Sequence, residues 1–356
     1  MYKENLAKYN LGENLDNLMN LDPRGYGVCR ILYDAARKYT KKPLTINAAQ
    51  KLVDEIKEGD LVYIITGFVL PSHKEAESDG IISSLFLARS LVKAFNAKPV
   101  IVCQEENLTA VRNLSFEMGL HLYDSIENLK KYPISIAVVP FTKDINKADQ
   151  MADELIKQGT PKAVISIEHP GKNQEDLYHN SLGIDCTDLE AKTDILFEKL
   201  VKMGVLNIAI GDLGNEIGMG TIASQVKKYI PYANLEDTSD NIGAATKTDN
   251  IITATVSDWG CNGLMAAIAY LKKDLDVFHD GAMQKEAMKI AARSGMNDMT
   301  GWLLPAIDGF GIDMNVYIVN LMREIVKSTL EHEKKSAVWF EKVEERGYFN
   351  DKIREM

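Results

Sequence analysis

The sequence predicts an α/β fold: an open, doubly wound, mostly parallel sheet in a Rossmann-like three-layer arrangement, with added N- and C-terminal helices. Two observations carry this prediction. Near-continuous apolar, β-branched runs predict strands that are buried on both faces, as in parallel sheets. Amphipathic stretches of helical length separate these runs, which is typical of alternating strand–helix units. The six predicted strands are residues 61–66, 99–103, 134–139, 163–167, 206–210 and 251–256.

Helical patterns precede, separate and follow the strands. Residues 1–58 are expected to form an N-terminal helical segment, in which Val28, Ile31 and Leu32 share one apolar face. Residues 312–356 are expected to form a C-terminal helical brace, with a long helix from about residue 314 to residue 343. The 356 residues contain no repeat and no Pro/Gly-rich linker, so we expect one α/β domain, 1–356, that carries both helical additions.

Composition excludes several classes of protein. With 46% hydrophobic and 26% charged residues, the chain is neither disordered nor fibrous. Lys and Arg number 41 against 51 Asp and Glu, and the net charge of −10 gives no general attraction to nucleic acid or to an anionic membrane. The first residues are polar and the apolar runs are too short to span a bilayer, so we expect a cytoplasmic protein with no membrane partner. Sparse cysteines without a Cys-x-x-Cys pair indicate a reducing compartment and no zinc module; they are Cys29, Cys103, Cys186 and Cys261.

In doubly wound sheets ligands bind outside the carboxyl ends of the strands, so chemistry is expected in the loops that follow them. The loop after the first strand offers candidate substrate-binding residues at both of its ends: Thr66, Gly67 and Phe68, and then Glu77, Asp79 and Gly80. Backbone N–H groups at the start of the next helix, near Ile81, could hold a carboxylate or a phosphate. Alternatively, Ser78 or Asp79 merely caps that helix.

Glu168-His169-Pro170-Gly171 follows the strand at 163–167. Pro and Gly predict a turn, so Glu168 could point into a cleft or be a solvated loop residue. His169 could bind an anionic substrate or transfer protons near neutral pH, or it could be incidental.

Residues 211–220, Gly-Asp-Leu-Gly-Asn-Glu-Ile-Gly-Met-Gly, carry the densest signal. Four glycines in ten residues permit positive φ angles and close approach of the backbone to a ligand. Asp212 and Glu216 could bind a divalent cation through oxygen atoms, or act as acid and base. The segment is neither a Walker A loop nor a good dinucleotide fingerprint, so no nucleotide cofactor is expected. A purely structural glycine-rich turn is the alternative.

Ser257-Asp258-Trp259-Gly260 follows the last predicted strand. Ser257 or Asp258 could cap the next helix, and Trp259 could wall a pocket or pack in the core. Cys261 would be a nucleophile only beside a base, and no sequence neighbour supplies one. Asp308-Gly309 is best explained as a turn.

Together, these acidic and glycine-rich strand ends predict one acidic cleft with three to five carboxylates and no Ser-His-Asp or Cys-His set. Acid–base or metal-assisted chemistry suits such a cleft better than acyl-enzyme chemistry.

The run IAIGDLGNEIGMG, preceded by TGF, ESDG and EHPG and followed by SDWG, resembles the D-glutamate cyclase family. The likeness is to the domain that forms the C-terminal half of the animal enzymes and stands alone in many bacteria, and it extends from LDPRGYG to the IDG at 307–309. It implies a lyase that converts D-glutamate to 5-oxo-D-proline and water. The chain departs from the family pattern at Leu213, where Gly is expected, at His169, where Arg is expected, and at 258–261, where Asn-Trp-Gly-Gly is expected.

Cyclisation chemistry suggests a role for each catalytic candidate. The expected catalytic residues are Asp212, Glu216, Asn215 and Glu168. Glu216 would be the base, and Asp212, alone or through Mg²⁺ or Mn²⁺, would help to activate the γ-carboxylate. Asp212 and Glu216 are accordingly the expected metal ligands. Backbone N–H groups of the loop would stabilise the oxyanion, at Gly214, Gly218 and Gly220 among others.

The remaining candidates would bind substrate. Glu77, Asp79 and Glu168 would hold the ammonium group or complete a metal shell. The α-carboxylate needs a positive partner, for which His169, Lys74 or the helix start at Gly80 are candidates.

Two other functions suit the same residues. A metal-dependent phosphate-handling enzyme would use the glycine N–H groups as a phosphate cradle, although the glycine loop contains no Lys or Arg. A non-catalytic protein that binds an amino acid or a small carboxylate would need the same cleft. The expected partner is therefore a small molecule, an acidic amino acid for a cyclase, and a homodimer is the commonest assembly for such enzymes.

Overall fold

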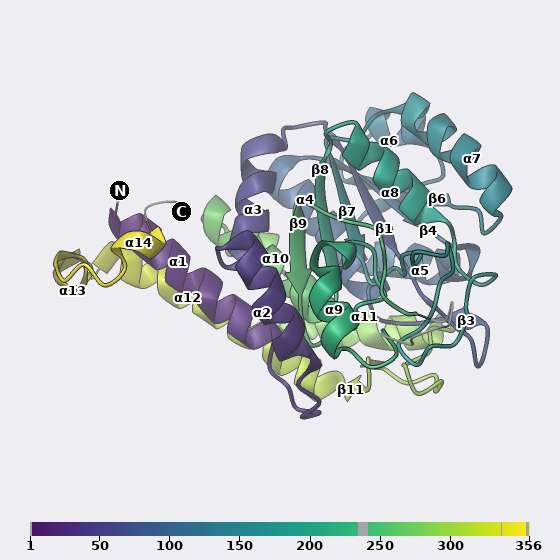
Figure 1. Cartoon of the computed structure of the whole chain (residues 1–356). Helices are drawn as coiled ribbons and strands as arrows, with labels where there is room; N and C mark the ends of the chain where they lie inside the picture. Colours follow the sequence, from purple (N-terminus) through teal and green to yellow (C-terminus); the bar gives the residue numbers. More distant parts are fainter. Residues whose placement is uncertain (1, 234–240, 336, 354–355) are drawn as a thin grey trace.

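The computed structural model describes residues 2–233, 241–335, 337–353 and 356. A seven-stranded sheet runs through its centre in the order β5-β6-β4-β1-β7-β8-β9, with every pairing parallel. Helices cover both faces of this sheet, giving the predicted open three-layer α/β fold (Figure 1). The strands are β1 (Leu61–Thr66), β4 (Lys98–Cys103), β5 (His121–Tyr123), β6 (Ser135–Pro140), β7 (Ala163–Ile167), β8 (Leu206–Gly211) and β9 (Asn250–Thr253).

All six predicted strands are present, and the differences lie at their ends. β9 stops at Thr253 instead of residue 256, because the chain turns there into the next helix. The sequence did not predict β5, whose three residues are exposed or half-buried and carry no apolar run. Two short antiparallel hairpins were also missed; they are β2 (Val69–Leu70) with β3 (Glu75–Ala76), and β10 (Ala306–Ile307) with β11 (Phe310–Gly311).

The strand order fixes where a ligand can bind. If the short β5 is left aside, the strands run in the chain order 3-2-1-4-5-6 of a doubly wound sheet. The direction of winding reverses between β1 and β7, which pair in parallel from Val62 opposite Ala163 to Thr66 opposite Ile167. The crevice outside the carboxyl ends of β1 and β7 is therefore the expected site.

Alternating side chains of each strand enter two separate cores. Tyr63 and Ile65 of β1 pack on the face covered by α6, α7 and α8. Val62 and Ile64 pack on the opposite face, with α3, α4, α10 and α12. Burial on both faces is why these strands are apolar throughout.

The helices include those that the apolar periodicity predicted, most of them starting or ending within a few residues of the predicted limits. They are α1 (Tyr2–Met19), α2 (Val28–Thr40), α3 (Leu44–Glu55), α4 (Ile81–Phe95), α5 (Leu108–Glu117), α6 (Ile126–Lys131), α7 (Ile145–Gln158), α8 (Thr193–Lys202), α9 (Ala223–Tyr229), α10 (Ser257–Lys272), α11 (Gly281–Arg293), α12 (Ile312–Lys335), α13 (Ala337–Glu345) and α14 (Asn350–Ile353).

The N-terminal helices are joined to the fold by one buried acid. Asp16 of α1 accepts hydrogen bonds from the backbone N–H groups of Leu44 (2.6 Å) and Thr45 (3.1 Å), and from the Thr45 hydroxyl (2.7 Å). The Tyr33 hydroxyl of α2 donates to the same carboxylate at 3.1 Å. Asp16 thus accepts hydrogen bonds from the N-terminal donors of α3, which would otherwise lack partners, and ties three helices together.

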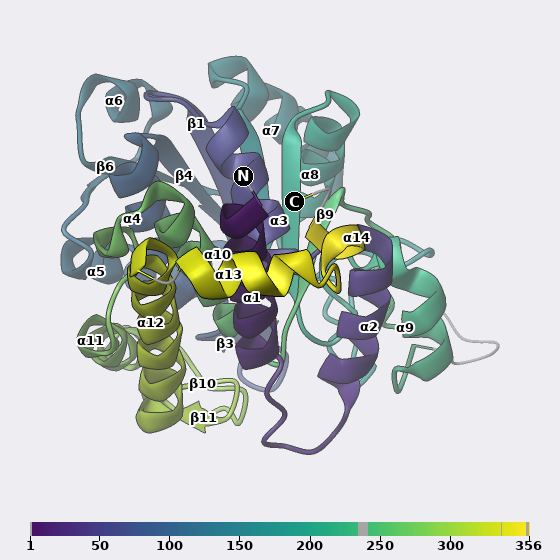
Figure 2. The same cartoon turned by 90° about the vertical axis from the view of Figure 1, so that its left-hand side faces the viewer.

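The C-terminal brace differs from the single long helix predicted for about 314–343. The structure describes two helices there, α12 and α13, and Figure 2 shows them running in clearly different directions. Val319 and Met322 of α12 join the core that contains α10, whereas Ile353 of α14 packs with Leu6 and Tyr9 of α1. The two ends of the chain therefore lie side by side.

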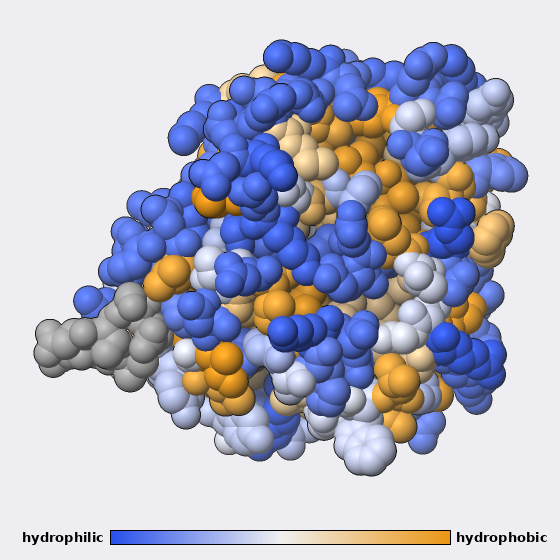
Figure 3. Space-filling model, turned by 90° about the vertical axis from the view of Figure 1, so that its right-hand side faces the viewer, coloured by the Kyte–Doolittle hydropathy of each residue, from blue (hydrophilic) through white to orange (hydrophobic). Residues whose placement is uncertain are grey.

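The outer surface carries both hydrophilic and hydrophobic residues. Figure 3 shows a largely hydrophilic face with small hydrophobic patches between. No helix in the described ranges combines the length and the apolar character that crossing a bilayer requires. All four cysteines are buried and free.

Candidate active site

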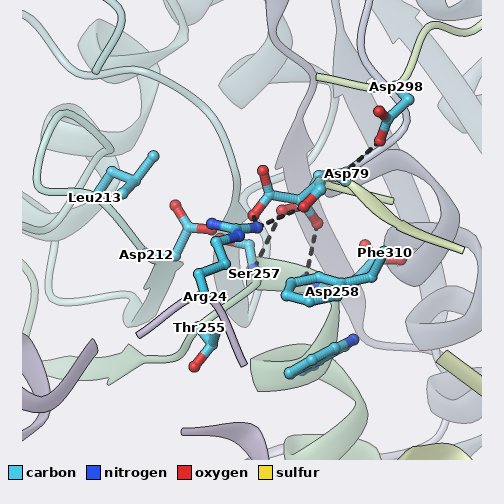
Figure 4. Close-up of polar contacts among 12 residues, drawn as sticks. Arg24, Asp79, Asp212, Leu213, Thr255, Ser257, Asp258, Asp298 and Phe310 are labelled. Atoms are coloured by element: carbon cyan, nitrogen blue, oxygen red, sulfur yellow. Dashed lines mark hydrogen bonds and ion pairs between the residues drawn. The ribbon is translucent and has the colours of Figure 1, made fainter. Parts of the chain in front are cut away.

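Three buried acids meet at the carboxyl edge of the sheet. Asp79 precedes α4, Glu168 follows β7 and Asp212 follows β8, with exposures of only 2%, 8% and 3%. One carboxylate oxygen from each lies within 4.8 Å of the others. Figure 4 shows Asp79 and Asp212 together with Ser257 and Asp258 of α10 in this region. The predicted acidic cleft thus exists, at the crevice between β1 and β7.

A cavity of about 160 Å³ opens beside these acids. This volume is well below the roughly 300–1,000 Å³ of sites for drug-sized ligands, so the cavity suits a small metabolite. Five residues that the sequence predicted line it: Phe68, Glu77, Glu168, Asp212 and Asn215. The other predicted residues lie outside the lining: Thr66, Gly67, Asp79, Gly80, His169, Gly214, Glu216, Gly218, Gly220, Ser257, Asp258 and Trp259.

The acids of the cleft hold protons more tightly than ordinary carboxyls. Burial, the charge of Glu168 and then that of Asp308 raise the pKa of Asp212 well above its usual value. Burial and Glu216 do the same to the pKa of Glu168, and burial and Asp308 to that of Glu77. Several carboxylates that lie this close in a dry site cannot all be ionised unless protons or cations neutralise them.

Hydrogen bonds within the cleft leave some acceptors free. Asp212 Oδ1 is buried and accepts no hydrogen bond from the described part of the chain, and the same holds for Asn215 Oδ1. Glu168 Oε2, in contrast, accepts from the Ser257 hydroxyl at 2.5 Å. An acceptor without a donor in a buried site costs free energy unless a ligand, a proton or a water completes it.

Asp79 and Asp258 cap each other's helices. Asp79 Oδ1 accepts from the backbone N–H of Asp258 at 2.9 Å, at the start of α10. Asp258 Oδ1 accepts from the N–H groups of Gly80 (2.9 Å) and Ser83 (3.3 Å), at the start of α4. The expectation that Ser257 or Asp258 caps its own helix was therefore wrong, as was the alternative that Ser78 or Asp79 caps α4. These reciprocal hydrogen bonds hold the first turns of α4 and α10 together beside the cleft.

Gly80 allows this close approach. Its φ angle is +77°, and a Cβ atom there would come within 2.6 Å of Glu168 Cβ and 2.9 Å of the Thr66 hydroxyl. The Gly80 N–H already donates to Asp258, so the helix start is not available to a substrate carboxylate. The Thr66 hydroxyl is fully buried beside Gly80. The carbonyl oxygen of Gly67 accepts a hydrogen bond from the Gln104 side chain at 3.1 Å.

Glu216 has a different position from the one expected of a base or a metal ligand. Its Oε1 accepts from the N–H groups of Asp212 (2.9 Å) and Leu213 (2.7 Å), and its Oε2 from Gly214 N–H at 2.8 Å. Glu216 is 1% exposed, is absent from the group of three acids and does not line the cavity. Its carboxylate holds the turn that presents Asp212.

The glycine loop does not form an oxyanion hole. The Gly214 N–H donates to Glu216, and the Gly218 and Gly220 N–H groups donate to the Thr246 carbonyl at 3.1 and 3.0 Å. Gly220 is needed for packing, because a Cβ atom there would lie 2.2 Å from the Ala245 carbonyl oxygen. The structural reading of these glycines is correct, and the predicted N–H cradle is wrong because its donors are already used.

The candidate cations for the substrate carboxylate are also misplaced. His169 is fully buried, its Nδ1 lies 3.0 Å from the Pro170 carbonyl, and burial lowers its pKa to about 4. The ring is therefore neutral near pH 7 and does not line the cavity. Lys74 lies in the exposed β2–β3 turn and is likewise absent from the lining.

Trp259, which was expected to wall a pocket or to pack in the core, is fully buried and donates from Nε1 to Asn315 at 2.9 Å, so it packs in the core.

Two charged residues of the site were missed by the sequence reasoning. Asp308, expected to be only a turn residue, lines the cavity and is 6% exposed. Arg24, from the loop between α1 and α2, forms an ion pair with it. The LDPRGYG and IDG segments that mark the two ends of the family likeness contain these residues, which is the signal that could have found them.

Left-handed backbone occurs at two acids of the cleft. Glu168 has φ +47° and Asp308 has φ +49°. Such conformations cost free energy in residues other than glycine, and they concentrate at functional sites. Both residues line the cavity.

Two comparisons with known proteins match parts of this sequence. The family model described as D-glutamate cyclase-like, C-terminal, matches residues 15–323, most of the chain. The human protein D-glutamate cyclase, mitochondrial, is 29% identical over 123 residues, which are 33% of this chain. The matched segment spans only 19% of the human protein's length.

Proposed function

The chain belongs to the D-glutamate cyclase-like, C-terminal family, and from this premise we propose that it is a lyase that converts D-glutamate to 5-oxo-D-proline and water. The observation that carries the proposal is the group formed by Asp79, Glu168 and Asp212 at a cavity sized for a small metabolite. The human relative's name supports the same reaction.

The reaction sets three requirements. The α-ammonium group must lose a proton before its nitrogen attacks the γ-carbon. The γ-carboxylate must be neutralised, since a carboxylate is a poor electrophile. As the C–N bond forms and one C–O bond breaks, that oxygen leaves as water with the two protons that the nitrogen has given up. A site that both accepts and donates protons therefore meets the need.

Glu168 and Asp212 suit the two proton transfers. Burial and Glu216 raise the pKa of Glu168, and the Ser257 hydrogen bond partly opposes this rise, so of the two acids we assign Glu168 as the group that takes a proton from the ammonium. Asp212 has an unpartnered Oδ1, and burial with Glu168 nearby raises its pKa, so it holds a proton to give to the departing oxygen. Asn215 Oδ1 has no partner among the described residues, while its Nδ2 donates to the His179 carbonyl at 3.1 Å, and this oxygen would accept a hydrogen bond from the substrate. Glu216 contributes to the reaction by positioning Asp212, and it is not the base.

The same acids could hold a divalent cation. Asp79, Glu168 and Asp212 each offer a carboxylate oxygen within the 4.8 Å group, and such hard oxygen donors are those that Mg²⁺ and Mn²⁺ prefer. A bound cation would supply Lewis acidity at the γ-carboxylate and would neutralise the crowded charges. The free Asp212 Oδ1 is consistent with this role.

Phosphate chemistry is less well supported. The glycine-loop N–H groups that would cradle a phosphate donate to Glu216 and Thr246 instead. A thiol nucleophile also lacks support, because Cys261 is fully buried and burial raises its pKa well above the usual value. A protein that binds an acidic amino acid without turnover is the alternative that the test must separate.

The test is turnover by metal-stripped protein. D-glutamate and L-glutamate are incubated separately, with and without Mn²⁺ or Mg²⁺, and 5-oxoproline is quantified by chiral chromatography. D-specific formation of 5-oxoproline is expected. Asp194→Asn is the matched control, because Asp194 is a fully buried acid outside the group and accepts from the Tyr178 hydroxyl at 2.6 Å. The Asp194→Asn variant should retain turnover. Binding of D-glutamate without formation of any product would contradict the lyase assignment and support a binding protein.

A further inference from the structure

The cavity lacks a cation of its own, although its proposed substrate is an anion. Among the lining residues that the structure describes there is no Lys or Arg. Arg24 is ion-paired with one of them, Asp308. Its Nη2 donates to the side chain and to the backbone carbonyl of Asp308, which lines the cavity.

Arg24 is held rigidly. Its guanidinium lies over the Phe310 ring at 4.8 Å from the centroid, and Phe310 in turn packs on Trp259 with 4.9 Å between centroids. Trp259 is fixed by its hydrogen bond to Asn315. An arginine clamped on one face by an aromatic ring and at one nitrogen by a carboxylate loses little rotamer freedom when it binds a ligand.

Most of the guanidinium donors have no recorded protein partner. Arginine carries five N–H donors, and both recorded contacts of Arg24 within the described ranges use Nη2. The side chain is 17% exposed, which leaves part of it accessible to a ligand. Figure 4 shows the guanidinium pointing toward the same space as Asp79 and Asp212.

We infer that Arg24 is the carboxylate receptor of this cleft and that its free edge binds the α-carboxylate of the substrate. The inference rests on the proposed function and names the group that selects its substrate. The planar fork of arginine matches a carboxylate in two parallel hydrogen bonds, whereas an ammonium group does not. The site therefore takes α-amino acids with a distal carboxyl, and amines without the α-carboxylate are poor substrates.

The test compares two substrates. D-glutamate has the α-carboxylate; 4-aminobutanoate has the amine and the distal carboxyl but lacks it. Arg24→Lys keeps the charge beside Asp308 and removes the fork, and Arg24→Gln removes both. Arg30→Gln, on the exposed surface of α2, is the matched control. Initial rates of lactam formation give kcat and KM for each protein, and melting temperatures confirm folding.

Arg24→Lys should lower kcat/KM for D-glutamate by about 100-fold, chiefly through KM, and change that for 4-aminobutanoate by less than about threefold. Arg30→Gln should change neither. Equal losses on both substrates, or no loss on D-glutamate, would overturn the receptor assignment.

Failure of the proposed function gives a different pattern, in which the unaltered protein forms no lactam from either compound. Calorimetry then decides the inference by itself. D-glutamate binding that is lost in Arg24→Gln and kept in Arg30→Gln supports the receptor, while absent binding or equal binding in all three proteins contradicts it.

Discussion

Asp16 and Asp212 are about equally deep in the protein, with exposures of 0% and 3%, yet they are supplied with hydrogen bonds very differently. Asp16 receives four, from Leu44, Thr45 and Tyr33. Asp212 Oδ1 receives none from the described residues, and its neighbours add negative charge instead of donors. Burial raises the pKa of Asp16 only to about 6, because those four hydrogen bonds oppose it, whereas Asp212 is raised well above its usual value.

The difference teaches that the supply of donors, more than burial, separates a structural acid from a functional one. Glu216 belongs with Asp16 by this criterion, since three backbone N–H groups satisfy it. Only three residues separate it from Asp212 in the sequence, and yet one acid is fully supplied with hydrogen-bond donors and the other is not.

The largest expected effect is that of Asp212→Asn. The amide cannot hold and return a proton, so kcat for 5-oxo-D-proline should fall by about 100-fold to 10,000-fold. The melting temperature should not fall, because the neutral amide, like the protonated carboxyl, adds no charge that the neighbouring acids would repel. Glu216→Gln is the contrasting variant: it leaves a backbone donor unpaired and should lower the free energy of unfolding by about 1–3 kcal/mol. Unchanged turnover in Asp212→Asn would contradict the functional role that the comparison with Asp16 gives to Asp212.

Asp16→Ala should have the opposite pattern. Four donors lose their acceptor at the junction of α1, α2 and α3, which should lower the free energy of unfolding by about 3 kcal/mol or more. Urea denaturation followed by circular dichroism measures it. The folded protein should keep its kcat for D-glutamate within about twofold. A stable variant that loses turnover would place Asp16 in the catalytic machinery.

The third prediction concerns pH. A carboxyl whose pKa is raised by folding binds more protons in the native state, so its stabilising contribution is present at low pH and is lost as the pH rises through the native pKa. Burial raises the pKa of Glu190 to about 8, and the cleft acids shift in the same direction. The free energy of unfolding should therefore increase from about pH 8 down to about pH 6.5, below which buried His169 begins to oppose it. Asp212→Asn should flatten this slope, and an identical slope would contradict the raised pKa.

The smallest effect is expected from Lys74→Ala. Lys74 is exposed in the β2–β3 turn and lies outside the cavity lining. KM for D-glutamate should change by less than about twofold and the free energy of unfolding by less than about 0.5 kcal/mol. A large rise in KM would restore Lys74 as a substrate-binding residue and weaken the assignment of Arg24.

The sequence predicted the sheet because burial on both faces leaves an unbroken apolar signal in each strand. It also predicted that Glu168 and Asp212 meet, since both follow strands that end at one edge. It missed Arg24, which comes from a helix connection and reaches the cleft only through packing of the N-terminal helices. The three hydrogen bonds that Glu216 accepts could not be predicted either, because the positions of their donors depend on the conformation of the turn at 212–214.

The most direct test of the central claim is a pH titration of the side-chain carboxyl ¹³C resonances of Asp, in the unaltered protein and in Asp212→Asn. The account predicts a carboxyl that still holds its proton at neutral pH and whose resonance is absent from the variant. If no Asp carboxyl that titrates above that of Asp16 is lost in the variant, Asp212 is as well supplied as Asp16, and the distinction drawn between them is wrong.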